Sequence, residues 1–138
     1  MNGPLVELRG VHFAYDADRP VLTDLDFAIH AGERIGLTGA NGGGKTTLLH
    51  LIVGLVKPTS GEIMCFGQPR KTEADFLDVR RRIGLLFQDS DDQLFCPTVA
   101  EDIAFGPFNL GKSRAVTAGI VRRTLDAVGL PGYEDRIA

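Results

Sequence analysis

The residues Gly39-Ala40-Asn41-Gly42-Gly43-Gly44-Lys45-Thr46 match the pattern G-x-x-x-x-G-K-[ST], a phosphate-binding loop (P-loop). Glycines let the backbone approach an anion closely because no Cβ intervenes, and successive N–H groups of the loop can point at it. A helix after the loop adds the positive end of its dipole. In this pattern the ammonium of Lys45 contacts the outer phosphates, and the hydroxyl of Thr46 coordinates Mg²⁺. The stretch therefore predicts that residues from Gly39 to Thr47 bind a nucleotide.

The surroundings of the loop favour a phosphate site over the alternative, a glycine-rich turn with an incidental lysine. Residues 34–38 (Arg-Ile-Gly-Leu-Thr) precede the loop and predict a buried strand. Residues 47–53 (Thr-Leu-Leu-His-Leu-Ile-Val) follow it and predict a helix that Gly54 closes. Strand, glycine loop and helix form the order that this kind of site requires.

Composition narrows the class of protein. The chain has 138 residues, of which 43% are hydrophobic and 24% charged, as is ordinary for one modest globular domain. The net charge of -3 gives no indication of a nucleic-acid surface, and we expect no nucleic-acid partner. Cys65 and Cys96 form no C-x-x-C pair, and His12, His30 and His50 share no ligand spacing. We therefore expect no disulfide framework and no histidine metal site. We also expect no signal peptide, because the first residues contain no basic segment followed by an apolar one, and no membrane span, because the longest apolar run, around residues 48–56, is too short.

Short strands are expected on both sides of the P-loop. Alternation of apolar and polar residues predicts strands at 5–9 and 11–15, separated by Gly10, and further strand at 21–29. After the P-loop helix we predict a strand at 62–66. A continuous apolar strand is also predicted at 83–87, which ends at Gln88.

Capping patterns predict three further helices. The first is expected at 72–81, opened by Thr72 and Asp75. The second is opened by the capping box of Thr98 and Glu101 and is expected to end at Phe105, because Gly106-Pro107 follows. The third is expected at 113–128, with Gly129 after it.

Several motifs together resemble the ATPases of ABC transporters, over the whole chain. Phe13-Ala14-Tyr15 is similar to the aromatic A-loop of that family, residues 58–63 (Pro-Thr-Ser-Gly-Glu-Ile) to its P-T-x-G-x-I segment, and Leu86-Phe87-Gln88 to its Q-loop. A narrower resemblance is to the ATPases of energy-coupling-factor transporters, which include cobalt and nickel importers. It is carried by residues 87–89 (Phe-Gln-Asp), 91–95 (Asp-Asp-Gln-Leu-Phe), 97–99 (Pro-Thr-Val) and 102–107 (Asp-Ile-Ala-Phe-Gly-Pro).

The resemblance implies roles for individual residues. It implies that Tyr15 stacks on adenine, the alternative being a core aromatic on a strand face. It implies that Gln88 coordinates Mg²⁺ and the attacking water and couples them to the transporter, the alternative being a polar strand end. Lys45 and Gln88 are then the catalytic residues, and Thr46 and Gln88 the metal residues. The nucleotide-binding residues are Tyr15, Gly39, Ala40, Asn41, Gly42, Gly43, Gly44, Lys45, Thr46 and Thr47.

The resemblance also implies the architecture and the partners. The fold class is α/β: the N-terminal portion of a P-loop NTPase domain, with an antiparallel β region, an incomplete and mostly parallel core and the start of a helical subdomain. We expect residues 1–88 to hold the β region and P-loop core, and residues 89–138 the start of the helical subdomain. The implied function is the ATP-binding, energy-coupling subunit of an importer of cobalt/nickel or energy-coupling-factor type. Its cofactors are ATP and Mg²⁺, and its partners are membrane subunits and a second ATPase subunit, alike or different, at the cytoplasmic face of the cell membrane. The acidic residues Asp89, Asp91 and Asp92 are expected in a solvated loop near the membrane subunit.

One departure from the family keeps other readings open. The sequence contains no LSGGQ-like signature, no apolar strand ending in Asp-Glu and no switch-histidine strand. We therefore expect ATP hydrolysis from a whole domain, and this chain by itself could be a truncated, non-hydrolysing nucleotide-binding fragment. A non-transport ABC ATPase is a second alternative, although it would not be expected to carry the segments 91–95 and 102–107. A P-loop kinase or GTPase would lack the strands before the loop and the aligned Gln88.

Overall fold

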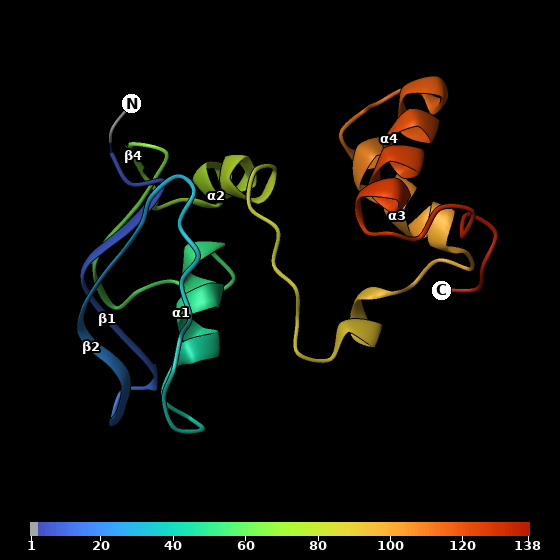
Figure 1. The fold of residues 1–138 in the computed structure, drawn as a ribbon. Helices are drawn as coiled ribbons and strands as arrows, with labels where there is room; N and C mark the ends of the chain where they lie inside the picture. The colour runs from blue at the N-terminus through green and yellow to red at the C-terminus, as the bar shows by residue number, and fades with distance from the viewer. Residues whose placement is uncertain (1–2) are drawn as a thin grey trace. The chain divides into compact units, whose positions relative to one another are not determined.

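The computed structural model describes residues 3–138, which divide into two compact units after Leu85 (Figure 1). The first unit contains an antiparallel sheet of four strands in the order β2-β1-β3-β4. Its strands are β1 (Val6–Asp16), β2 (Arg19–Ile29), β3 (Ser60–Cys65) and β4 (Gln68–Pro69). β1 and β2 form a hairpin in which Asp16 pairs with Arg19, so a two-residue turn joins them.

β1 is one strand where the sequence predicted two. The alternation at 5–9 and 11–15 is present, but Gly10 does not end the strand. The pairing register shifts between Leu8 and Val11 on one side of β1 and between Arg9 and His12 on the other. The Gly10 N–H donates to the Asp26 carboxylate at 2.7 Å. An irregularity that satisfies its own polar groups can be accommodated inside a strand, which is why the break predicted at Gly10 is wrong.

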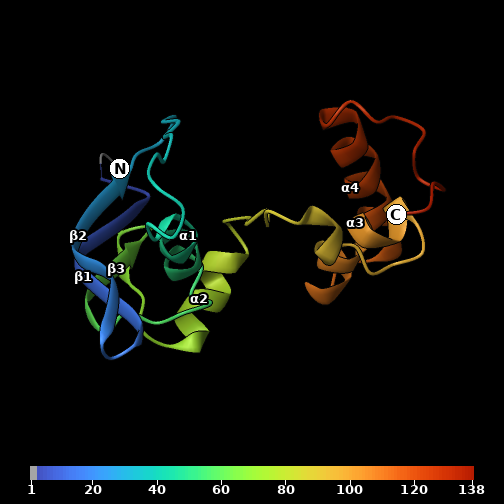
Figure 2. The same ribbon diagram turned by 90° about the horizontal axis from the view of Figure 1, so that it is seen from below.

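Two helices cover one side of this sheet: α1 (Lys45–Ile52) and α2 (Glu73–Arg80). Figure 1 and Figure 2 both place them on the same side. The buried core lies between the two layers, with Leu8, Val11 and Ile63 from the strands and Leu51 and Phe76 from the helices. Burial of such side chains is the main stabilising contribution in a unit of this size.

The two strands predicted at 34–38 and 83–87 are absent. Neither stretch is strand, and Ile35, Leu37, Leu86 and Phe87 are exposed. A buried parallel strand is held by hydrogen bonds to neighbouring strands and by layers on both of its faces. Among residues 3–138 the only strands are β1 to β4, and none of them pairs with either stretch. The apolar sequence is therefore present, but the parallel core is not assembled in the described residues.

The second unit is helical. It contains a short 3₁₀ turn η1 (Ser90–Gln93) and the helices α3 (Val99–Asn109) and α4 (Arg114–Ala127). Val121 and Leu125 of α4 pack on Ala104 of α3 in a small buried cluster. An isolated bridge joins Thr98 to Ile137 and ties the last residues to the start of α3. Within the described chain, no helix combines the length and the apolar character that crossing a bilayer requires.

The capping predictions are confirmed. The Thr72 hydroxyl accepts from the Asp75 N–H while the Asp75 carboxylate accepts from the Thr72 N–H, and Thr98 and Glu101 form the same reciprocal pair. The predicted end of α3 is wrong, because the helix continues through Pro107 to Asn109. It ends in a Schellman motif, in which the Lys112 N–H donates to the Pro107 carbonyl at 3.0 Å. Proline lacks one N–H donor, but its own carbonyl can still accept this closing bond.

Candidate nucleotide site

The P-loop runs directly into α1 and is shaped by its last glycine. Gly44 has φ +80° and is the N-cap of α1 in the left-handed region. A Cβ on Gly44 would stand 2.7 Å from Leu22 Cδ2 and 3.3 Å from Val21 Cγ1, both on β2. Only glycine combines this backbone conformation with so close an approach to a neighbouring strand. β2 therefore holds the end of the loop against the start of the helix.

The start of α1 has the features of an anion site. No side chain caps the helix, and its first turn contains no acidic residue. The first N–H groups of a helix have no partner inside the helix, and the helix dipole places partial positive charge beside them. The remaining loop residues are all exposed: Gly39, Ala40, Asn41, Gly42 and Gly43. A phosphate can therefore approach these backbone donors without displacing a side chain.

Lys45 folds back over the loop. Its Nζ donates to the Gly39 carbonyl at 2.8 Å and to the Ala40 carbonyl at 2.7 Å. An ammonium has three donors, so a third remains beyond these two bonds. The cation is thus held at the mouth of the loop by backbone acceptors that a phosphate oxygen can replace. This site fits a nucleotide phosphate chemically. It combines unpartnered N–H donors at the helix start, exposed loop glycines and a cation beside the loop.

The two threonines that follow differ in environment. Thr46 is exposed, whereas Thr47 is only 5% exposed. The Thr47 Oγ1 lies 3.3 Å from the hydroxyl oxygen of Tyr15, and either oxygen could be the donor. This bond joins the first turn of α1 to β1. The structure thereby brings together Tyr15 and the P-loop helix, which the sequence could only assign to one site through a family resemblance.

The environment of Tyr15 excludes the core role that was its alternative. Its side chain is 61% exposed, although the neighbouring Phe13 is buried. The two rings meet edge to face, with centroids 4.8 Å apart and an interplanar angle of 89°. An exposed aromatic ring beside the helix that follows the glycine loop is suited to stacking on a base.

Gln88 belongs to the second unit, and its side chain is exposed. Next to it, the Phe87 N–H donates to the Gln93 Oε1 at 3.0 Å, which bends the chain toward η1. Asp89, Asp91 and Asp92 are exposed around this turn. No group of three or more His, Cys, Asp or Glu side chains in the described residues is arranged to hold a metal ion. The metal role of Gln88 stays a prediction.

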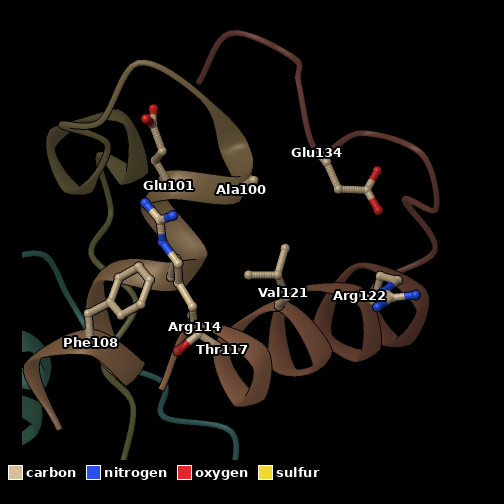
Figure 3. Close-up of a pocket in the computed structure, with 10 residues that line it drawn as sticks. Ala100, Glu101, Phe108, Arg114, Thr117, Val121, Arg122 and Glu134 are labelled. Atoms are coloured by element: carbon tan, nitrogen blue, oxygen red, sulfur yellow. The ribbon is translucent and has the colours of Figure 1, made fainter. Parts of the chain in front are cut away.

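A hollow of about 360 Å³ between α3 and α4 was missed by sequence reasoning. Its lining includes the small side chains of Ala100 and Ala104 as well as charged side chains such as Arg114 and Glu134. Figure 3 shows Val121 and Arg114 rising from α4 toward α3. The available signal was the spacing of Ala100 and Ala104, which places two small residues on one face of a helix. No glycine is among the residues that line the hollow, so it does not resemble the glycine-rich P-loop.

Comparison with known proteins places these features in a family. Residues 22–138 match the family model described as "ABC transporter". The energy-coupling factor transporter ATP-binding protein EcfA of Methanocaldococcus jannaschii is 41% identical over 133 residues, covering 96% of this chain and 48% of the relative. The corresponding EcfA protein of Methanothermobacter thermautotrophicus is 39% identical over 133 residues, covering 96% of this chain and 43% of the relative.

A solved structure supports the same assignment. It is cbiO1 from Clostridium perfringens, described as part of the ABC transporter complex cbiONQ. It superposes with a TM-score of 0.86 at 28% sequence identity, over 98% of this chain and 54% of cbiO1. The chain thus spans about half the length of the relatives it matches. The α/β P-loop fold expected from the sequence is confirmed, and the chain belongs to the ABC transporter family.

Proposed function

We propose that this chain is the nucleotide-binding part of the ATP-binding subunit of an importer of cobalt/nickel or energy-coupling-factor type. One observation carries the proposal: an uncapped helix start, behind a left-handed Gly44, over which the Lys45 ammonium is already folded. The names of the relatives support the transporter class, because they are energy-coupling factor ATP-binding proteins. The narrower resemblance of residues 87–107 supports the same class of transporter, which includes cobalt and nickel importers.

In this proposal each part of the site binds one part of MgATP. The N–H groups at the start of α1 hold a phosphate, and Lys45 exchanges its two carbonyl partners for phosphate oxygens. Thr46, whose side chain is exposed, offers its hydroxyl toward Mg²⁺. Bound Mg²⁺ would neutralise charge on the phosphates. Tyr15 gives its exposed ring to the adenine.

The second unit carries the surface that we assign to the membrane subunit. Within residues 88–95, Leu94 is 49% exposed and Phe95 is 63% exposed. Phe95 meets Phe105 edge to face at 4.6 Å, which keeps both rings together at the surface. Adjacent exposed apolar side chains, unlike isolated ones, mark interaction sites. Gln88, in the same segment, would then couple nucleotide state to the partner at the cytoplasmic face of the membrane, where a second ATPase subunit completes the assembly.

Intrinsic fluorescence tests the nucleotide site directly. The chain has no tryptophan and two tyrosines, so Tyr133→Phe leaves Tyr15 as the only tyrosine fluorophore. We expect ATP with Mg²⁺ to quench this fluorescence, because a stacked base changes the surroundings of the ring, and tripolyphosphate to leave it unchanged. The matched control is Tyr15→Phe, in which the remaining Tyr133 signal should not respond to ATP. Equal responses to ATP and tripolyphosphate, or none to either, would contradict the proposed site.

A further inference from the structure

The bond between Tyr15 and Thr47 is the feature of the site that no recognised motif explains. It joins residues 32 positions apart, with 3.3 Å between the two hydroxyl oxygens. Thr47 is in the first turn of α1 and is almost fully buried, so its hydroxyl has little access to water. A buried hydroxyl is costly without a partner, which gives this contact more weight than the same contact at an exposed position.

The bond also supplies what the Tyr15 ring otherwise lacks. Most of the ring is exposed, and its packing contact on β1 is the edge-to-face meeting with Phe13. Contact on one side leaves an exposed side chain free to rotate about its χ angles. A second anchor at the far end of the ring, the hydroxyl, restricts that rotation. This anchor, Thr47, is on α1, which begins at the P-loop. The orientation of the Tyr15 ring is therefore fixed relative to the P-loop.

We infer that Thr47 is a positioning residue, which holds the Tyr15 ring in the orientation that stacks on the base. The inference rests on the proposed function, and it adds a link between the base site and the phosphate site. A hydroxyl has one donor and two acceptor positions. The Tyr15 hydroxyl can therefore donate to Thr47 Oγ1. Preorganisation of the ring lowers the conformational entropy that ATP binding would otherwise lose.

Tyr15→Phe is the first test, because it removes the hydroxyl and retains the ring. One hydrogen bond of ordinary net strength corresponds to about a three- to tenfold change in the dissociation constant. We expect calorimetry to show that loss for MgATP and no change for tripolyphosphate, which has no base. Tyr133→Phe is the matched control, since it removes a tyrosine hydroxyl from the second unit and should leave both affinities unchanged.

A double-mutant cycle then assigns the effect to Thr47. Thr47→Val removes the partner hydroxyl at nearly constant shape, so the double variant with Tyr15→Phe should bind MgATP no more weakly than Thr47→Val alone. Thr47→Ser keeps a hydroxyl, and in that background Tyr15→Phe should again cost three- to tenfold. Urea unfolding of each variant checks that the fold is retained.

The outcomes separate the inference from the proposed function. If Tyr15→Phe binds MgATP as tightly as the unaltered chain, or if the two losses add in the double variant, the positioning role is wrong and the nucleotide site stands. Equal losses for MgATP and tripolyphosphate in Tyr15→Phe would show a structural role only, which also overturns the inference. If the unaltered chain binds neither ligand, the proposed function fails and the inference fails with it.

Discussion

Gly54 ends the helix that carries the P-loop, and adding a methyl group there should destabilise the first unit in two ways. Gly54 has φ +71°, in a region that costs an L-residue about 1–2 kcal/mol. A Cβ would also overlap the ring of Phe76 in α2, which is 2% exposed. α2 is held in place because Arg80 donates to the carbonyls of Val53 and Gly54, both at 2.9 Å. Overpacking adds about 1–3 kcal/mol, so Gly54→Ala should lower the free energy of unfolding by about 2–5 kcal/mol.

Gly67→Ala is the matched control in the same unit. Gly67 has φ +75°, and no atom lies within 4 Å of where its Cβ would be. The Gly67→Ala variant should therefore lose only the stability that the strained backbone conformation costs, about 1–2 kcal/mol of the free energy of unfolding. The measurement is urea unfolding in a Tyr133→Phe background, in which the tyrosine fluorescence comes from Tyr15 and reports on the first unit. Equal losses for the two glycine variants would refute the steric argument at Phe76.

Four further predictions test the site, the charges, the partner surface and the chemistry. Lys45→Ala should weaken the binding of MgATP at least tenfold in calorimetry, because charge-assisted bonds to phosphate are strong. As a control, Lys112→Ala, which replaces an exposed lysine of the second unit, should leave the MgATP affinity unchanged. The Thr72 and Lys71 N–H groups lower the pKa of Asp75 from its ordinary 3.8 to about 2, so its contribution to stability is fully present above pH 4 and is lost as the pH falls toward 2. Asp75→Asn should flatten acid unfolding in that window, and an unchanged pH profile would contradict the assignment. In a complex with the membrane subunits, residues 88–95 should crosslink to a membrane subunit. Crosslinks to the membrane subunit only from β1 and β2 would contradict the proposed partner surface. The purified chain should release no steady phosphate from ATP, because the sequence has no Asp-Glu pair after an apolar strand to orient a water; release that Lys45→Ala abolishes would locate the catalytic base elsewhere.

Features encoded within a few neighbouring residues could be predicted from the sequence. The capping boxes at Thr72 and Thr98 were correct because both partners of each pair lie within one helical turn. The helix after the P-loop was correct for the same reason, although it begins at Lys45, two residues before the predicted start. The family also followed from the order of short motifs along the chain.

Tertiary structure decided whatever depends on a distant partner. The apolar stretches at 34–38 and 83–87 have strand sequences but form no strands, because a strand needs a hydrogen-bonded neighbour and the described residues supply none. Gly10 sits inside β1 because strands on both sides of it continue the pairing. Tyr15 and Thr47 meet although 32 positions separate them, which no local pattern records. The sequence by itself determined the glycine loop, the helix after it and the family. The exposure of Tyr15 and its bond to Thr47 were decided only by packing β1 against α1, because that contact exists only once the sheet and the helix are folded together.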